Sequence, residues 1–377
     1  MSLGHCDPAF AAVREVFDDN LARGEDLGAA VAVFVDGRSV VDLWGGVADD
    51  ATGRPWEQDT ACITFSATKA VTTAAALLLI ERGVVDVATP VTDWWPEFGV
   101  NGKARTTVEH LLTHGAGLPA LDRPISADEA ADPLAMAEQL AGQTPEWEPG
   151  TAHGYHALTF GWLVGELVRR HTGQTVGEFV RDEIDKELFI GVPEDMLAGL
   201  ARLTAGRPLK APDPAVDLAT VARVVAAAQD PQSPMMRSTA NPAASFNKPD
   251  VLTGGWPAAG LVCTARALGD FYRRLVDGRL LGRGPVREAV RERVRGPDRT
   301  LVSETAFGLG FMRPSANMWL PPPARAHAFG HPGASGALGL GDLEAGVAIG
   351  YIPNLTHPAL GDRRAYRLVD AVYRSLS

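Results

Sequence analysis

The stretch Ser66-Ala67-Thr68-Lys69, continued by AVTTAAALLLIERG as far as Gly83, carries the strongest structural signal in this chain. Its apolar run predicts a helix over Lys69–Arg82 that ends at Gly83. Because residues three apart share one face of a helix, the Lys69 amine can take the proton of the Ser66 hydroxyl. A helix N-terminus also directs free N–H groups toward an anion that forms there. This stretch therefore predicts a nucleophilic serine, its base and part of an oxyanion hole.

The pattern Ser-x-x-Lys is weak by itself, because Ser245-Phe246-Asn247-Lys248 also matches it. That second copy opens no apolar helix and has Pro249 directly after its lysine, so we interpret it as a loop. Lysine is rare in this chain: of the 35 basic residues, 5 are Lys and 30 are Arg. Arginine cannot give up its proton whereas a desolvated lysine can, so a lysine at position 69 favours a catalytic role.

Helical and strand patterns segregate along the chain. Apolar residues at helical spacing predict a helix over Asp7–Arg23, and β-branched runs on either side of Asp36-Gly37 predict a hairpin. Between Thr64 and Thr253 the patterns are helical and strands are scarce. The helices predicted there are Lys69–Arg82, Val108–Thr113, Leu134–Ala141 and Thr159–His171. After Gly255 the predicted elements are a helix over Ala265–Val276, strands over Ala326–Gly330, Ala337–Leu340 and Val347–Ile352 with a turn at Gly341-Asp342, and a last helix over Asp362–Leu376.

This order of elements predicts an α/β (α+β) fold in which an antiparallel sheet is built from both ends of the chain, flanked by helices and joined to an inserted all-helical domain. The expected α/β domain spans residues 1–65 and 255–377, and the mostly helical domain spans 66–254. We expect the active site at their interface. The proline-rich stretches Pro208–Pro214, Pro231–Pro249 and Pro321–Pro323 are expected to be surface loops.

Composition excludes several classes of protein. The apolar runs are short: Ala74 to Ile80, which no other run exceeds, is far shorter than the roughly 18 residues of a membrane span. The net charge of −11 would repel nucleic acid on average. Three widely spaced cysteines and an N-terminus without a secretory pattern predict a cytoplasmic protein with neither a zinc site nor a disulfide framework. No HExxH, G-x-G-x-x-G or P-loop pattern is present, so we expect no metal and no cofactor.

Two further segments carry candidate chemistry. Tyr155 comes just before a predicted helix, where a phenol could reach a neighbouring lysine. The segment Gly330–Gly336, with sequence GHPGASG, lies between two predicted strands, and its glycine and proline content is typical of a strand that a ligand backbone approaches closely. Ser335 nearly fits the nucleophile pattern G-x-S-x-G, but the last position is Ala337 and no helix follows, so we do not interpret it as a nucleophile.

With these elements in this order, the sequence resembles the serine β-lactamase and penicillin-binding-protein superfamily, and most closely its family VIII carboxylesterases. The resemblance extends from about Asp7 to Leu376 and implies a β-lactamase/transpeptidase-like fold. Besides Ser66-x-x-Lys69, the matching segments are Thr107–His114 with Gly117-Leu118-Pro119, Glu148-Pro149-Gly150 before Tyr155, Ala259–Ala265, and His331-Pro332-Gly333.

The resemblance implies a role for each element of the site. Ser66 would be the acylated nucleophile, and Lys69 and Tyr155 would be the general base and proton shuttle; which of these two takes the first proton stays open. The backbone N–H groups of Ser66 and Ala334 would form the oxyanion hole.

Substrate contacts are expected on the strand and beside the tyrosine. The segment from His331 to Gly333 would be the counterpart of the K-T-G strand, so that His331 and Gly333 contact the substrate. His156 is the third expected substrate-binding residue.

Two departures from the pattern bear on the substrate. Tyr155-His156-Ala157 stands where β-lactamases and DD-peptidases usually have Y-x-N, and His331-Pro332-Gly333 stands where they have K-T-G. A charged, amide-bearing substrate therefore loses two anchors. The sequence predicts a cytoplasmic serine hydrolase that cleaves small carboxylic esters through an acyl-Ser66 intermediate. The alternatives are an acyltransferase of the same fold, a β-lactamase or D-aminopeptidase-type amide hydrolase, and a non-catalytic binding or sensor protein.

Overall fold

Two long strands joined at Asp36-Gly37 lie at the heart of the main sheet in this computed structural model, which describes residues 1–207, 218–358 and 362–376. They are β2 (Gly28–Val35) and β3 (Arg38–Asp49), and they pair antiparallel. Asp36 and Gly37 have φ values of 48° and 76°, the left-handed conformation that a two-residue hairpin turn needs at both positions. The predicted hairpin is confirmed.

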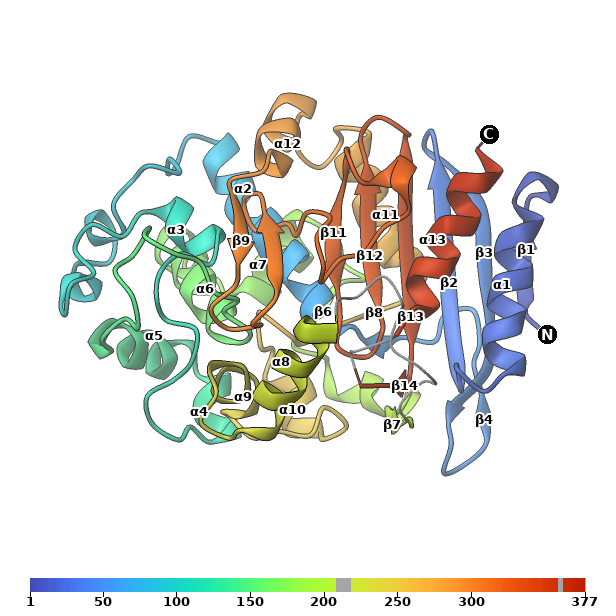
Figure 1. Cartoon of the computed structure of the whole chain (residues 1–377), viewed down its shortest axis with the longest axis horizontal. Coiled ribbons are helices and arrows are strands. Elements are labelled where there is room, and N and C mark those ends of the chain that lie inside the picture. Colours follow the sequence, from blue (N-terminus) through green and yellow to red (C-terminus); the bar gives the residue numbers. More distant parts are fainter. Residues whose placement is uncertain (208–217, 359–361, 377) are drawn as a thin grey trace.

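The main sheet combines strands from both ends of the chain (Figure 1). Among the described residues it has seven strands in the order β1-β3-β2-β13-β12-β11, with β4 paired to β3. The other five are β1 (Leu3–Cys6), β4 (Arg54–Pro55), β11 (Ala328–Pro332), β12 (Leu338–Asp342) and β13 (Val347–Pro353). Every pairing is antiparallel, so the predicted fold class is confirmed. The domain boundaries at 65/66 and 254/255 stay a prediction.

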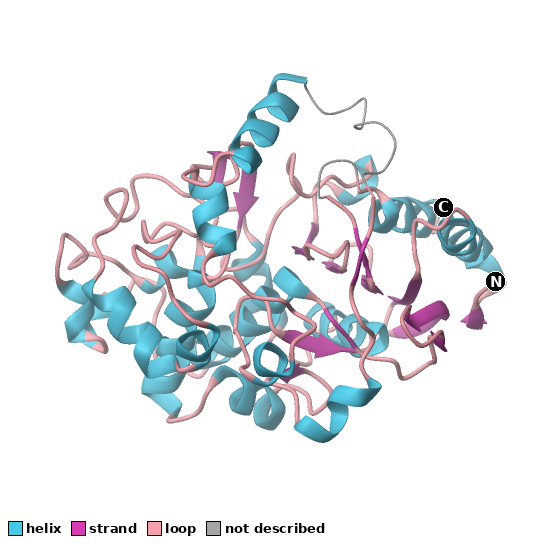
Figure 2. Ribbon diagram, turned by 90° about the horizontal axis from the view of Figure 1, so that it is seen from below, coloured by secondary structure: helices cyan, strands magenta, loops and turns pink. Residues whose placement is uncertain are grey.

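Both faces of the main sheet are buried, and the alternation along β2 shows how. Ala29, Val31 and Val33 belong to one hydrophobic cluster, whereas Ala30, Ala32 and Phe34 belong to the other. Helices α1 (Ala11–Ala22) and α13 (Arg364–Ser375) cover the first face, and α11 (Ala265–Val276) covers the second. Figure 2 shows the strands nearly end-on, with the helices of both termini on one side. The bounds of α11 are those that the sequence predicts.

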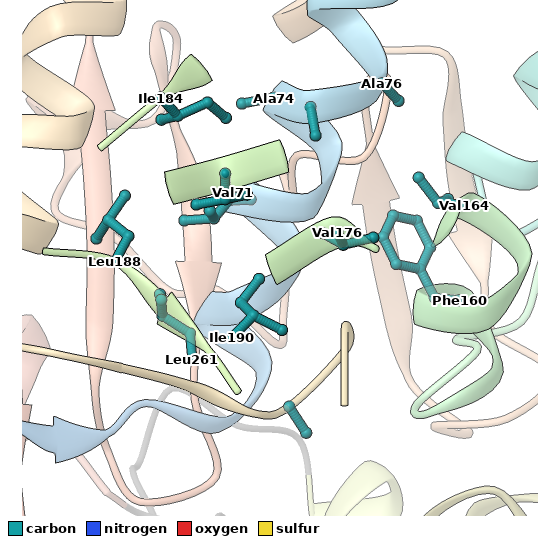
Figure 3. Close-up of a cluster of buried hydrophobic side chains, with 14 of the residues drawn as sticks. Val71, Ala74, Ala76, Phe160, Val164, Val176, Ile184, Leu188, Ile190 and Leu261 are labelled. Atoms are coloured by element: carbon teal, nitrogen blue, oxygen red, sulfur yellow. The ribbon is translucent and has the colours of Figure 1, made fainter. Parts of the chain in front are cut away.

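Helix α2 (Thr68–Glu81) passes through the middle of the molecule and is buried almost all round. Its side chains pack against α6 (Thr159–Thr172) and α7 (Val176–Glu183) (Figure 3). The remaining helices are α3 (Val108–Leu112), α4 (Ala127–Ala131), α5 (Pro133–Gly142), α8 (Leu218–Gln229), α9 (Pro234–Ala240), α10 (Pro249–Thr253) and α12 (Arg283–Val290). In the described part of the chain, none of the helices has the length and apolar character needed to cross a bilayer.

A small sheet lies in the middle of the chain, where the sequence predicted few strands. It consists of β5 (Cys62–Ile63), β8 (Leu261–Cys263) and β6 (Phe189–Ile190). These strands were missed because each is only two or three residues long, too short for a periodic pattern. The pairing sets Cys62 opposite Cys263, and both are buried free thiols. Separate pairings join β9 (Val294–Pro297) to β10 (Glu304–Phe307) and β7 (Thr204–Ala205) to β14 (Leu355–Thr356).

Two local predictions need correction. The turn expected at Gly341-Asp342 comes later, because β12 continues through Asp342, whose carboxylate accepts hydrogen bonds from the backbone N–H groups of Glu344 and Ala345. The stretch Pro231–Pro249, expected to be a loop, contains α9, because a proline at the first position of a helix is tolerated. The stretch Pro208–Pro214 lies outside the described residues.

Candidate active site

The candidate nucleophile sits in a tight turn immediately before α2. Ser66 is half-buried within the 3-10 turn Phe65–Ala67, and Phe65 has a φ of 49°, a strained value for a residue with a side chain. The backbone of Leu261 in β8 holds both ends of this turn. Its carbonyl accepts a hydrogen bond from Thr64 N at 2.8 Å, and its N–H donates to the Thr68 hydroxyl at 2.9 Å. The turn is therefore fixed by the small sheet, not by the helix alone.

Lys69 lies one helical turn below the serine hydroxyl and is fully buried. Its Nζ is 3.4 Å from Ser66 Oγ, 2.6 Å from the carbonyl oxygen of Ala157 and 3.1 Å from that of Ala258. Burial holds the pKa of Lys69 well below its usual range. A neutral amine has two N–H hydrogens, and the two carbonyls accept both of them. Its lone pair then remains for the proton of Ser66.

Tyr155 joins the same cluster from the segment that precedes α6. Lys69 Nζ lies 4.7 Å from the centre of the Tyr155 ring. Burial raises the pKa of Tyr155 above its ordinary value, so the phenol stays protonated at neutral pH. Its backbone N–H donates to both carboxylate oxygens of buried Asp298, at 3.0 and 3.1 Å. Asp298 thus fixes the backbone of Tyr155 at this position.

His331 at the end of β11 faces the phenol. The two are 3.4 Å apart from Tyr155 Oη to His331 Nε2, and His331 Nδ1 is 2.7 Å from the carbonyl oxygen of Pro332. Because a carbonyl only accepts, Nδ1 carries the proton and Nε2 is left as an acceptor for the phenol. Burial lowers the pKa of His331 to about 3, so the ring is neutral under working conditions. The predicted counterpart of the K-T-G strand therefore brings no positive charge to the site.

The turn after β11 lies against the nucleophile turn. A Cβ on Gly333 would lie 2.1 Å from the carbonyl oxygen of Thr64, so only glycine permits this approach. Ala334 follows on the exposed rim. In the described part of the chain, neither the Ser66 N–H nor the Ala334 N–H has a hydrogen-bond partner, as expected for donors that await an oxyanion. Ser335 is fully buried, and its hydroxyl accepts from Ala337 N.

His156 departs from the role that the sequence suggested. Its Nε2 accepts a hydrogen bond from Leu118 N at 3.0 Å, and its Nδ1 is 2.6 Å from the carbonyl oxygen of Gly154. Both ring nitrogens thus have backbone partners, and the side chain is 1% exposed. The prediction that His156 binds substrate therefore finds no support in this geometry. The histidine instead ties the segment before α6 to the loop after α3.

Sequence reasoning missed several residues that shape the site. The carbonyls of Ala157 and Ala258 leave no trace in side-chain patterns. Asp298 had a recognisable signal, because Gly-Pro-Asp is a typical turn sequence and its carboxylate also accepts from Thr300 N and Leu301 N. No cluster of side chains suited to a metal ion occurs within the described ranges.

Comparison with known proteins identifies the family and agrees with the fold. A sequence model of the beta-lactamase family matches residues 13–373. The protein "Esterase/beta-lactamase LipL" of Mycobacterium tuberculosis is 36% identical over 366 residues, which cover 93% of this chain and 82% of that protein. Two solved structures superpose over 100% of both chains: a family VIII carboxylesterase, 29% identical with a TM-score of 0.87, and a penicillin-binding protein homolog from Caulobacter crescentus, 35% identical with a TM-score of 0.86. The chain therefore belongs to the beta-lactamase family.

Proposed function

We propose that this protein is a serine hydrolase that cleaves small carboxylic esters through an acyl-Ser66 intermediate. One observation carries the proposal: buried Lys69 Nζ lies 3.4 Å from Ser66 Oγ and within hydrogen-bond distance of the carbonyls of Ala157 and Ala258, which can accept both hydrogens of a neutral amine and leave its lone pair for Ser66. This arrangement favours Lys69 over Tyr155 as the first base, because the phenol keeps its proton at neutral pH.

The reaction then divides into two half-reactions. In the first, Ser66 Oγ attacks the ester carbonyl while its proton passes to Lys69, and the tetrahedral oxyanion accepts hydrogen bonds from the N–H groups of Ser66 and Ala334. The phenol of Tyr155 gives a proton to the leaving alkoxide and recovers one from Lys69. In the second, water attacks the acyl-enzyme by the same route and releases the acid, which restores Ser66.

The substrate class follows from what the site lacks. Ala157 has no side-chain amide to hold an acylamino group, and its carbonyl is already taken by Lys69. His331 stands where a lysine would attract a substrate carboxylate, but it is neutral. An uncharged ester does not need these anchors. The names of the M. tuberculosis relative and of the carboxylesterase structure support the same substrate class.

The test compares wild type, Ser66→Ala and the matched control Ser245→Ala on p-nitrophenyl acetate to octanoate and on a chromogenic cephalosporin. We expect short-chain ester turnover to fall by about 10³-fold or more in Ser66→Ala and to stay unchanged in Ser245→Ala. Near wild-type turnover by Ser66→Ala would overturn the proposal. Rapid cephalosporin hydrolysis would place a β-lactamase first, and ester product that rises with added acceptor alcohol would indicate an acyltransferase.

We also propose that the protein works in the cytoplasm on a small-molecule ester, without a nucleic-acid partner. The three cysteines are free, and Cys62 and Cys263 stay unjoined although they face each other across two strands, which fits a reducing compartment. The net charge of −11 opposes binding to nucleic acid. Thiol titration of protein purified without reductant tests the first point: fewer than three free thiols would count against it.

A further inference from the structure

A fully buried arginine lies behind the turn that carries Ala334. Arg364, the first residue of α13, has no exposed side-chain surface. Its Nε donates to Asp362, its Nη1 to Asp26 and to the carbonyl of Glu25, and its Nη2 to Asp362 and to the carbonyl of Ser335. A guanidinium has five N–H groups, so each of them has an acceptor.

The guanidinium is itself held on two sides. Asp26 is fully buried in the segment between α1 and β2, and it also accepts from the hydroxyl of Tyr351 in β13 at 2.7 and 2.8 Å. Asp362 accepts through both oxygens, at 3.0 and 2.7 Å, in the fork geometry that fixes the plane of an arginine. Arg364 is therefore anchored to the sheet and to the start of α13 before it reaches the active-site turn.

The contact with the turn is close and specific. Arg364 Nη2 lies 2.9 Å from the carbonyl oxygen of Ser335. The next residue, Gly336, has a φ of 93°, and a Cβ placed on it would lie 2.4 Å from Arg364 Nη2. The glycine thus lets the backbone approach the guanidinium.

Ala334 is consequently fixed from both sides. Before it, Gly333 packs on the carbonyl of Thr64 and donates its N–H to Ala337 O at 2.7 Å. After it, the Ser335 carbonyl is pinned by Arg364, and Gly336 N donates to Gly333 O at 2.9 Å. The direction of the Ala334 N–H therefore depends on where Arg364 holds the Ser335 peptide.

We propose that Arg364 is a positioning residue for the oxyanion hole: through the Ser335 carbonyl it aims the Ala334 N–H at the developing oxyanion. This role rests on the proposed function, because it assumes that Ala334 N–H serves an acyl-transfer transition state. Burying an ionic network of this kind is weak support for stability by itself, since apolar residues of similar volume usually serve as well. The network instead holds the Ser335 peptide in one fixed position. An oxyanion-hole donor such as the Ala334 N–H needs this, because it must already point at the oxyanion when the negative charge develops.

The chain offers a matched control one helical turn away. Arg367 of α13 donates to Asn20 in α1 and pairs with Glu25 after it, so it also ties α13 to this region, and among the described residues its side-chain hydrogen bonds and ion pair do not involve the 333–337 turn. Arg367→Gln therefore tests the loss of an α13 ion pair without disturbing the Ser335 carbonyl. Arg364→Lys keeps a positive charge but cannot reproduce the fork.

The experiment measures kcat and KM on p-nitrophenyl butyrate, the inhibition constant of an alkyl boronic acid, and thermal stability for both variants. For Arg364→Lys we expect kcat to fall about 10- to 100-fold with KM within about 3-fold, and inhibition by the boronic acid, which mimics the tetrahedral adduct, to weaken by a factor similar to that in kcat. For Arg367→Gln we expect a lower melting temperature with kcat within about 3-fold of wild type.

Two results would overturn the proposal: a folded Arg364→Lys variant with wild-type kcat, or one in which boronate affinity is kept while kcat falls. Should Arg364→Lys fail to fold, Asp362→Asn leaves the guanidinium in place and loosens its fork. In Asp362→Asn, a kcat reduced by about 3- to 10-fold together with weaker boronate binding supports the positioning role of Arg364, and an unchanged kcat contradicts it. If Ser66→Ala is inactive while Arg364→Lys is fully active, the positioning role alone is wrong; if Ser66→Ala is active, the proposed function is wrong.

Discussion

The two Ser-x-x-Lys tetrads of this chain share a spacing but not a structure. Ser66 and Lys69 lie within one continuous helical turn, and Lys69 points into the core. Ser245 and Lys248 are exposed, and Lys248 has the extended conformation of a residue that precedes a helix, with φ −83° and ψ 137°. A three-residue spacing aligns two side chains only where the backbone is helical. The chemistry therefore resides in the burial and the backbone partners of the lysine, and the motif alone does not supply them.

Exchanging the two lysines for methionine gives the sharpest test of this difference. Lys69→Met keeps the length and apolar body of the side chain but removes the base, so kcat/KM should fall by about 10²- to 10⁴-fold. Lys248→Met should leave kcat/KM within about 2-fold of wild type. The measurement is steady-state turnover of p-nitrophenyl butyrate by both variants, with circular dichroism to verify folding. Equal losses in the two variants would contradict the assignment of the base.

The surroundings of the first tetrad should also make the fold sensitive to acid. Burial lowers the pKa of His331 to about 3, that of His156 to about 4 and that of His114 well below its usual value. Between pH 6.5 and these values the unfolded chain binds protons that the native state does not. The free energy of unfolding therefore loses nothing to these three histidines above pH 6.5, and it falls by on the order of a few kcal/mol as the pH drops toward 4.

Melting temperatures from pH 7.5 to pH 4 measure this loss. His156→Gln should lower the melting temperature at neutral pH but flatten its pH dependence, because one buried titrating ring is gone. The exposed His327 provides the control, and His327→Gln should give a curve parallel to that of wild type. A wild-type melting temperature that is constant down to pH 4 would contradict the neutral state of the buried histidines.

Features of the structure that are set by a short stretch of sequence could be predicted, and those that join distant parts of the chain could not. Helix α2, helix α11 and the Asp36-Gly37 hairpin follow from short periodic patterns and were found nearly to the residue. Helix α7 was missed, although Thr175 and Glu178 form a capping box at its start. Ser66 and Lys69 are paired by a single helical turn, so their proximity could be predicted. The Arg364–Asp26 contact joins residues 338 positions apart, and no local pattern encodes it.

His156 shows what side-chain identity alone leaves open. The sequence analysis predicts that it contacts the substrate, and the structure gives both of its ring nitrogens backbone partners. A histidine has two polar ring atoms, and once burial had been imposed by the neighbouring core, both had to find partners in the backbone. Sequence patterns locate such a residue, but they do not say whether its polar atoms face a ligand or the protein itself.

The smallest expected effect concerns a contact between the second tetrad and the residue that precedes the first. The ring of Phe246, inside the second tetrad, lies 4.8 Å from the ring of Phe65, which directly precedes Ser66, and 5.6 Å from that of Trp256 in an edge-on contact. Phe65 has a strained backbone, with φ 49°, so ring contacts that hold it also hold the nucleophile turn. Phe246→Leu keeps an apolar side chain but loses the aromatic pairs.

We expect Phe246→Leu to lower the free energy of unfolding by about 1 kcal/mol and to change kcat/KM by less than about 3-fold. Denaturant titration and ester turnover measure the two quantities, with Ser245→Ala, in the same exposed segment, as the control that should change neither. The second tetrad would then stabilise the strained turn through the packing of Phe246, and its serine and lysine would contribute nothing. A loss of kcat/KM as large as that of Lys69→Met would show instead that this segment takes part in the chemistry, and the contrast between the two tetrads would no longer hold.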